Sequence, residues 1–252
     1  NSLKSALVPW FARIPRRTGY VGELRFGLLN DARRLDRRRL PQTVQRFVAL
    51  GLPADAQSPP AIPSPRLAVQ DADIEAALAR LELARPTRPL LALCPGAEYG
   101  PAKRWPAEHF AAVARAKIAQ GWSVWLFGSD KDAPVTATIR AMLGAHCIDL
   151  AGRTRLAEAI DLLALATQVV SNDSGLMHVA AALERPLVAV YGSSDPGFTP
   201  PLSPRAQVVS RRLACSPCFK RECPYGHYDC LRGLHPEQVL AALAALPAGG
   251  GA

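Results

Sequence analysis

The sequence lacks any long apolar run, and it has few aromatic residues, lysines and methionines. A membrane-spanning helix needs about 20 consecutive apolar residues, and no stretch of this chain approaches that length. The first residues also lack the charged and then apolar pattern of a secretory signal peptide. We therefore expect a cytoplasmic protein, and a hydrophobic content of 49% indicates a chain that can bury an adequate core.

The scarcity of lysine leaves arginine as the main source of positive charge. Lysine supplies five of the 30 cationic side chains, the formal net charge is +9, and residues 13–46 hold ten arginines against Glu23, Asp31 and Asp36. Such a basic segment can attract nucleic acid, anionic lipid or a phosphorylated glycolipid. It can equally be the solvated face of a chain that is rich in arginine.

Short apolar strands alternate with helices from residue 90 onward. A stretch rich in Pro, Ala and Ser over residues 51–65 precedes them and predicts a linker or surface loop. The patterns predict a helix over 71–83, strands over 90–94, 122–127, 147–150, 168–171, 187–191 and 206–210, and helices over 107–120, 130–143, 156–166, 175–183 and 236–246. Repeated strand–helix units with apolar strands indicate an α/β fold with a parallel sheet covered on both faces.

The segment over residues 169–183 predicts a strand, a tight turn and a helix. Asp173 and Ser174 favour a helix N-terminus at this turn, and Gly175 lets another group approach the backbone. The free N–H groups and the dipole of such a terminus favour phosphate. His178 follows one turn later on the same face as Ser174. The alternative is an ordinary helix that Asp173 caps, with His178 as a packed side chain.

A second element that favours anions lies over residues 95–106, between the strand 90–94 and the helix 107–120. This Gly/Pro loop carries Lys103 and Arg104, and its Glu98 contacts sugar hydroxyls or neutralises Lys103. Open α/β sheets bind ligands at the carboxyl edge of their strands, so the two elements together predict a ligand with a diphosphate. The loops that carry Ser129 and Thr154 end strands at the same edge, where they border the ligand or are plain turns.

Four cysteines follow the last of these loops. Cys215, Cys218, Cys223 and Cys230 have the spacing C-x2-C-x4-C-x6-C. Because cytosolic chains rarely use cysteines for disulfides, the cluster predicts a structural zinc site, remote from the reacting groups, or free thiols.

The sequence resembles the family of ADP-heptose:lipopolysaccharide heptosyltransferases along most of its length. The matching runs are residues 1–6, 17–20, 28–31, 95–106, 128–129, 172–183 and 198–203. The resemblance implies a GT-B type glycosyltransferase with Rossmann-like domains. It also implies that the N-terminal domain is incomplete here, because the family's Gly-rich first loop, with the expected catalytic base, is absent from this sequence. The implied divisions are a remnant of the acceptor-side domain and linker (1–75), a nucleotide-sugar-binding domain (76–235), and a C-terminal helix and tail (236–252).

The resemblance also implies a reaction. Heptose would pass with inversion from ADP-heptose to the first heptose of the lipopolysaccharide inner core, at the inner face of the inner membrane, without a required metal. The residues expected to bind substrate are Glu98, Lys103, Arg104, Ser129, Thr154, Asp173, Ser174, Gly175 and His178. We expect no nucleic-acid partner and no turnover by this chain alone. Two alternatives stay open, a zinc-stabilised nucleic-acid-binding protein and a nonenzymatic nucleotide-binding module.

Overall fold

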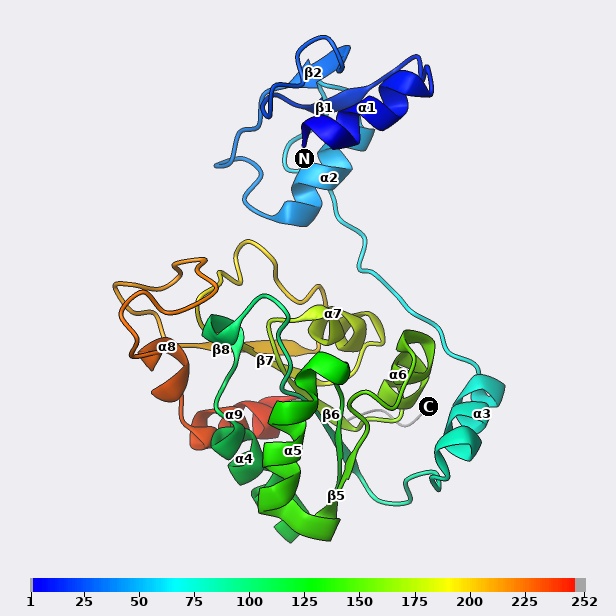
Figure 1. Cartoon of the computed structure of the whole chain (residues 1–252), viewed down its shortest axis with the longest axis vertical. Helices are drawn as coiled ribbons and strands as arrows, with labels where there is room; N and C mark the ends of the chain where they lie inside the picture. The colour runs from blue at the N-terminus through cyan, green and yellow to red at the C-terminus, as the bar shows by residue number, and fades with distance from the viewer. Residues whose placement is uncertain (1, 248–252) are drawn as a thin grey trace. The chain divides into compact units, whose positions relative to one another are not determined.

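The computed structural model describes residues 2–247, which form two compact units (Figure 1). The smaller unit runs to Pro63 and includes Gly197–Pro200, and the larger unit contains the rest. The division falls after Pro63 and not after residue 75, because helix α3 (Asp71–Leu81) packs its buried face into the core of the larger unit. No helix within the described residues is long and apolar enough to cross a membrane.

The smaller unit contains elements that the sequence patterns did not predict. Helices α1 (Leu3–Phe11) and α2 (Thr43–Gly51) accompany two short parallel strands, β1 (Thr18–Tyr20) and β2 (Asp31–Arg33). The strands are too short to show a clear alternation, and hydrogen bonds add to the burial of Tyr20 in holding them. The exposed Asn30, for example, accepts the Arg17 N–H and donates to the Pro15 carbonyl.

The larger unit is built on a six-stranded parallel sheet with the order β5-β4-β3-β6-β7-β8. Its strands are β3 (Leu90–Cys94), β4 (Ser123–Leu126), β5 (Cys147–Asp149), β6 (Gln168–Asn172), β7 (Leu187–Tyr191) and β8 (Ala206–Ser210). All residues of the central β3 and of β7 are buried. The parallel sheet that the strand–helix alternation predicts is therefore confirmed.

Helices cover both faces of this sheet. The core on one face includes α3, α6 (Leu156–Leu163) and α7 (Gly175–Ala182), and the core on the other includes α4 (Ala107–Ala119), α5 (Ala133–Leu143) and α9 (Pro236–Ala245). Because Val239 and Leu243 of α9 are fully buried in the second core, this helix belongs to the larger unit and forms no separate part. Residues 248–252 of the predicted C-terminal tail lie outside the described residues.

The strand order reverses between β3 and β6. From β3 the chain proceeds to β4 and β5 on one side, and from β6 it proceeds to β7 and β8 on the other. The loops that follow β3 and β6 therefore diverge at the carboxyl edge, and such a switch point opens a crevice in α/β sheets. The two loops are those in which the sequence places Lys103 and Asp173.

A buried amide ties these loops together. Asn172, which is fully buried at the end of β6, accepts the Trp105 N–H at 3.1 Å and donates to the Pro95 carbonyl at 2.6 Å. Pro95 and Trp105 lie at the two ends of the loop that follows β3, so this one side chain fixes both ends against β6.

We expect Asn172→Ala to lower the free energy of unfolding of the larger unit by about 2–4 kcal/mol, because it leaves a buried N–H and a buried carbonyl without partners. Urea unfolding measures the change. Asn30→Ala is the matched control, since it removes the same two kinds of hydrogen bond at an exposed position. An equal effect of the two variants on the larger unit's transition would contradict this role of Asn172.

Candidate functional site

A cavity of about 450 Å³ opens at the carboxyl edge of the sheet. Residues from the loops after β3, β4, β5 and β6 line it, and one wall is apolar. Leu156, Ala159, Leu176 and Val179 form that wall, and Leu156 keeps 68% of its surface exposed. An exposed apolar wall beside polar loop ends is typical of a site for a planar ring that carries a polar tail.

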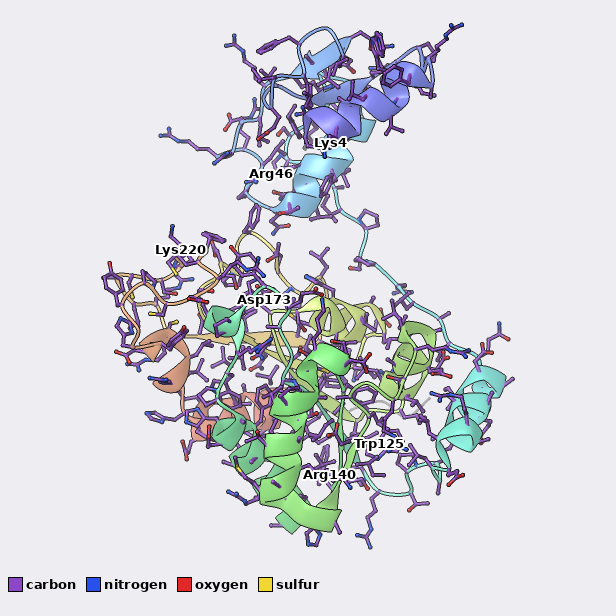
Figure 2. The ribbon with its side chains drawn as sticks, in the orientation of Figure 1. Lys4, Arg46, Trp125, Arg140, Asp173 and Lys220 are labelled. Atoms are coloured by element: carbon purple, nitrogen blue, oxygen red, sulfur yellow. The ribbon has the colours of Figure 1, made fainter. Side chains whose placement is uncertain are left out.

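Lys103 and Asp173 meet, although 70 positions separate them in the sequence. The Lys103 Nζ lies 2.6 Å from the Asp173 Oδ2, and the same oxygen accepts the Ser194 hydroxyl at 2.5 Å. Asp173, labelled in Figure 2, directly follows β6. The Asp173 side chain is 5% exposed and that of Lys103 is 19% exposed. The carboxylate therefore holds the ammonium in place, and Lys103 keeps donors for another anion.

The N-terminus of α7 opens into the cavity without a side-chain cap. Ser174 is the N-cap residue, but its side chain makes no capping hydrogen bond and lies 3.3 Å from the Ser171 hydroxyl. The alternative in which Asp173 caps the helix is wrong, because its carboxylate bonds to Lys103 and Ser194. Ser174, Gly175 and Leu176 line the cavity, so the first N–H groups of the helix are available to a ligand.

His178 lies on the exposed side of α7, within electrostatic range of both ions. Partial desolvation lowers the pKa of His178 below its ordinary value, with the Asp173 carboxylate acting against this change and Lys103 adding to it. The ring is therefore mostly neutral at pH 7. His178 is not a lining residue of the cavity.

Glu98 and Ser129 line the cavity, with partners that the sequence did not indicate. Glu98 pairs with Lys131 at 2.5 Å and not with Lys103, and this hydrogen bond holds the pKa of Glu98 below its usual range. Ser129 bonds through both its N–H and its hydroxyl to the Asp132 carboxylate.

Sequence reasoning missed Asp132. Its side chain lines the cavity and packs against two glycines, since a Cβ on Gly128 would lie 2.8 Å from the Asp132 Cβ and one on Gly96 would meet the carboxylate itself. Glycine at the ends of two neighbouring strands, followed by an acidic residue, is the signal that could have found it.

Two other predicted residues differ in their placement. Thr154 lines the cavity. Arg104 does not, because it borders a different hollow with Trp105 and its Nε donates to the Ala97 carbonyl at 3.3 Å. A guanidinium held by the backbone of its own loop is a structural element there.

The cysteine segment lies against the loop of Lys103 and is not remote from the site, contrary to the prediction. The Tyr99 hydroxyl donates to the Phe219 carbonyl at 2.7 Å, and the Arg221 carbonyl accepts the Ala102 N–H at 3.0 Å. All six cysteines of the chain are free. Among residues 2–247, no three His, Cys, Asp or Glu side chains already surround a point that could hold a metal ion.

The cysteine thiols differ in their surroundings. Hydrogen bonds from backbone N–H groups, that of Tyr228 above all, lower the pKa of Cys223. Burial raises the pKa of Cys230, and the neighbouring Cys218, Cys215 and Cys223 add to this increase. Cys94 and Cys147 are buried on their strands, and burial raises the pKa of Cys94 to about 12.

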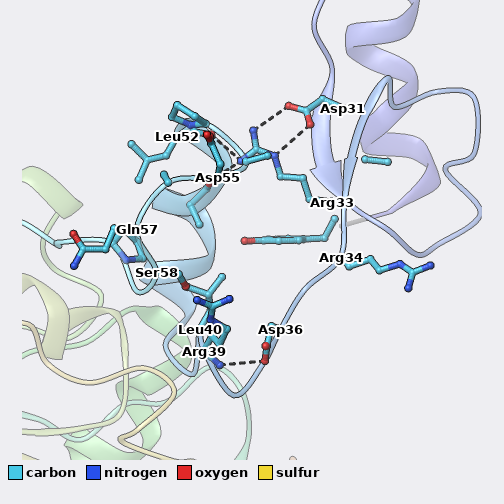
Figure 3. Close-up of a pocket in the computed structure, with 17 residues that line it drawn as sticks. Asp31, Arg33, Arg34, Asp36, Arg39, Leu40, Leu52, Asp55, Gln57 and Ser58 are labelled. Atoms are coloured by element: carbon cyan, nitrogen blue, oxygen red, sulfur yellow. Dashed lines mark hydrogen bonds and ion pairs between the residues drawn. The ribbon is translucent and has the colours of Figure 1, made fainter.

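A second cavity, of about 480 Å³, lies within the smaller unit (Figure 3). Arg33 crosses one side, bonded to the Asp31 carboxylate and to the carbonyls of Ala49 and Leu52. The guanidiniums of Arg34 and Arg39 are exposed where they border this cavity. They belong to the basic segment 13–46, but Asp31, Asp36 and Asp55 line the same cavity, so side chains of both charge signs border it.

The crevice at a switch point, the apolar wall and the uncapped helix end have the arrangement of the α/β domains of GT-B glycosyltransferases. The family model for glycosyltransferase family 9 (heptosyltransferase) matches residues 1–229, and the chain belongs to that family.

Several relatives support this assignment. The chain is 46% identical to lipopolysaccharide heptosyltransferase 2 of Salmonella typhimurium and to that of Escherichia coli K12, over 98% of this chain and 73% of each relative. It is also similar to the solved structure of Escherichia coli ADP-heptose lps heptosyltransferase II, with 43% identity and a TM-score of 0.84 over 96% of this chain and 73% of the other. A family 9 glycosyltransferase from Veillonella parvula, with 24% identity and a TM-score of 0.76, covers 96% of this chain and 70% of its own, and shows the same fold.

Proposed function

We propose that this chain carries the donor-binding part of a heptosyltransferase that transfers L-glycero-D-manno-heptose from ADP-heptose to the first heptose of the lipopolysaccharide inner core. Family membership and the names of the 46%-identical relatives support this reaction. The structural observation that supports it best is the cavity in which an apolar wall meets the uncapped N-terminus of α7. Lys103 is not a lining residue of this cavity, but it pairs with Asp173, the residue before the N-cap. Both observations favour the transferase over a nucleic-acid-binding protein.

The cavity suits the two ends of ADP. An adenine ring placed against Leu156 and Val179 covers apolar surface, while Thr154, Ser129 and Asp132 offer polar groups to the ribose. The diphosphate then reaches Ser174 and Gly175, where the first N–H groups of α7 and the Lys103 ammonium meet it. His178, largely neutral, is available as a hydrogen-bond partner on the same helix.

In the reaction, an acceptor hydroxyl attacks the anomeric carbon of heptose from the face opposite to ADP, so the configuration inverts. A carboxylate base takes the hydroxyl proton, and the bond from the anomeric carbon to the ADP phosphate oxygen breaks. Negative charge grows on the departing diphosphate. The Lys103 ammonium and the N-terminus of α7 carry fixed positive charge that stabilises the diphosphate. We therefore propose that the donor site requires no divalent metal.

We propose that the acceptor is an anionic glycolipid at a membrane surface. The basic segment 13–46, with Arg34 and Arg39 exposed at the second cavity, provides the positive surface that an anionic glycolipid would meet. We therefore propose a cytoplasmic protein that works at the inner face of the inner membrane.

Lys103→Ala is expected to weaken ADP-heptose binding by about 1.5–3 kcal/mol, the free energy of a charge-assisted hydrogen bond. Lys103→Arg should restore binding only in part, because a planar guanidinium fills the site differently from an ammonium. Titration calorimetry on this chain measures both. Lys4→Ala, which removes an exposed lysine of the smaller unit, is the matched control and should change the affinity much less.

Removing Lys103 also leaves the nearly buried Asp173 without its cation. The double variant Lys103→Ala/Asp173→Asn removes that carboxylate charge and keeps the binding defect. Unchanged affinity in Lys103→Ala, or full recovery in the double variant, would contradict a direct contact between Lys103 and the diphosphate.

Binding of ADP-heptose should be the same, within about twofold, with and without added Mg²⁺ or Mn²⁺, because fixed cationic groups take the role of a metal. Calorimetry in buffers that differ only in these ions tests this. A requirement for either ion would show that the phosphate site has been placed wrongly.

This 252-residue chain alone should bind ADP-heptose without measurable transfer, since it spans 73% of the length of its enterobacterial relatives and the resemblance assigns the base to a loop outside it. The assay uses a heptose-terminated acceptor, with the full-length Escherichia coli relative as the positive control. Detectable transfer by the chain would overturn this expectation.

A further inference from the structure

The segment between β8 and α8 (Asp229–Arg232) is a long stretch without helix or strand. It covers residues 211–228, and loops of this length inside a compact domain are uncommon unless they are functional or held by some other means. Its large side chains contribute little, since Phe219 is 46% exposed and Tyr225 is 69% exposed. The segment therefore lacks an apolar core of its own.

Backbone contacts give this segment a defined path all the same. The N–H groups of Cys218 and Phe219 both donate to the Ser193 carbonyl, at 3.0 and 2.7 Å, and the Gly226 N–H donates to the Cys223 carbonyl at 3.1 Å. Phe219 and Tyr228 adopt left-handed backbone conformations at φ 54° and 55°. Non-glycine residues adopt that region at a cost, so the path is specified by more than the local sequence.

Three of the four cysteines lie in this segment, and the fourth, Cys230, is buried in α8 directly after it. A tight turn follows Cys223, whose carbonyl accepts the Gly226 N–H. His227 lies inside the run, but its Nδ1 accepts the Asp229 N–H.

We propose that Cys215, Cys218, Cys223 and Cys230 bind one Zn²⁺ as four thiolates, and that the bound ion stiffens the support of the Lys103 loop. Four sulfur ligands with short spacings are the donor set that structural zinc prefers. The sulfurs do not yet surround one point, so their side chains rotate toward the ion as it binds. Each coordinating thiol releases its proton to solvent.

The contacts of Arg221 connect this site to the donor cavity. Arg221 lies between Cys218 and Cys223, its carbonyl accepts the Ala102 N–H, and its Nε donates to the Tyr99 carbonyl at 2.7 Å. Gly100 lies so close that a Cβ there would be 2.5 Å from the Arg221 carbonyl oxygen. The Tyr99 ring in turn lies 5.2 Å from the Lys103 ammonium. An ion that fixes the cysteines therefore fixes the backbone on which the Lys103 loop rests.

Elemental analysis of the untagged chain, purified under reducing conditions, tests the metal directly. We expect about one zinc per chain in the wild type, as four thiolates fill one tetrahedral site, and almost none in Cys223→Ser. Cys147→Ala, which removes a buried thiol from β5, is the matched control and keeps the metal. Absence of metal from the wild-type chain, or iron in place of zinc, would overturn the proposal.

A second measurement tests the zinc site even if Cys223→Ser does not fold. Wild-type chain stripped of metal is titrated with Co²⁺, which should give thiolate-to-cobalt charge-transfer absorption and tetrahedral d–d bands. Trypsin should cut after Lys220 and Arg221 faster in the stripped form than in the reloaded form. Co²⁺ spectra without sulfur coordination, or equal cleavage rates, would contradict the proposed site.

The proposed link between the zinc site and the Lys103 loop rests on the proposed donor site. The affinity for ADP tests this link separately. ADP should bind the stripped chain at least about fivefold more weakly than the zinc-loaded chain, a typical coupling between two sites. Equal affinity would overturn the link and leave the zinc site standing. Zinc binding without any ADP binding would instead count against the proposed function.

Discussion

The ion pair between Lys103 and Asp173 depends on the reversal of strand order, and the rest of the site depends on the ion pair. A carboxylate that is 5% exposed is costly unless it is paired and hydrogen-bonded. Lys103 and Ser194 together satisfy it, and Asn172 keeps the two loops in register behind it. Ser174, the N-cap residue of α7, directly follows Asp173, so the ion pair lies next to the helix N-terminus.

The fold of the larger unit could be predicted from the sequence because each of its strands and helices has a local sequence pattern. Apolar strands such as Leu90–Cys94 and Leu187–Tyr191 fall where the pattern predicts them, and the rule that parallel strands share a carboxyl edge was enough to join Lys103 with Asp173. The direction in which an individual side chain points could not be predicted from the sequence. Arg104 follows Lys103 directly, yet a hydrogen bond to its own loop turns it to another surface.

The sequence did not reveal the roles of residues that depend on neighbours far away along the chain. Asp132 is an ordinary acidic residue in a turn until two glycines from separate strand ends make room for it. Glu98 forms an ion pair with Lys131, which lies in the next loop along the sheet. The cysteine segment follows the last strand, and only the folded chain brings Arg221 against Gly100 and Ala102. The short elements of the smaller unit gave no periodic signal at all.

The exposed Leu156 has a thermodynamic consequence. With 68% of its surface in water at the mouth of the cavity, it is apolar surface that a bound aromatic base would cover. Removal of such surface from water lowers the heat capacity of the complex relative to its free components. Donor binding would then release more heat as the temperature rises, with little change in affinity, because the entropy becomes less favourable at nearly the same rate.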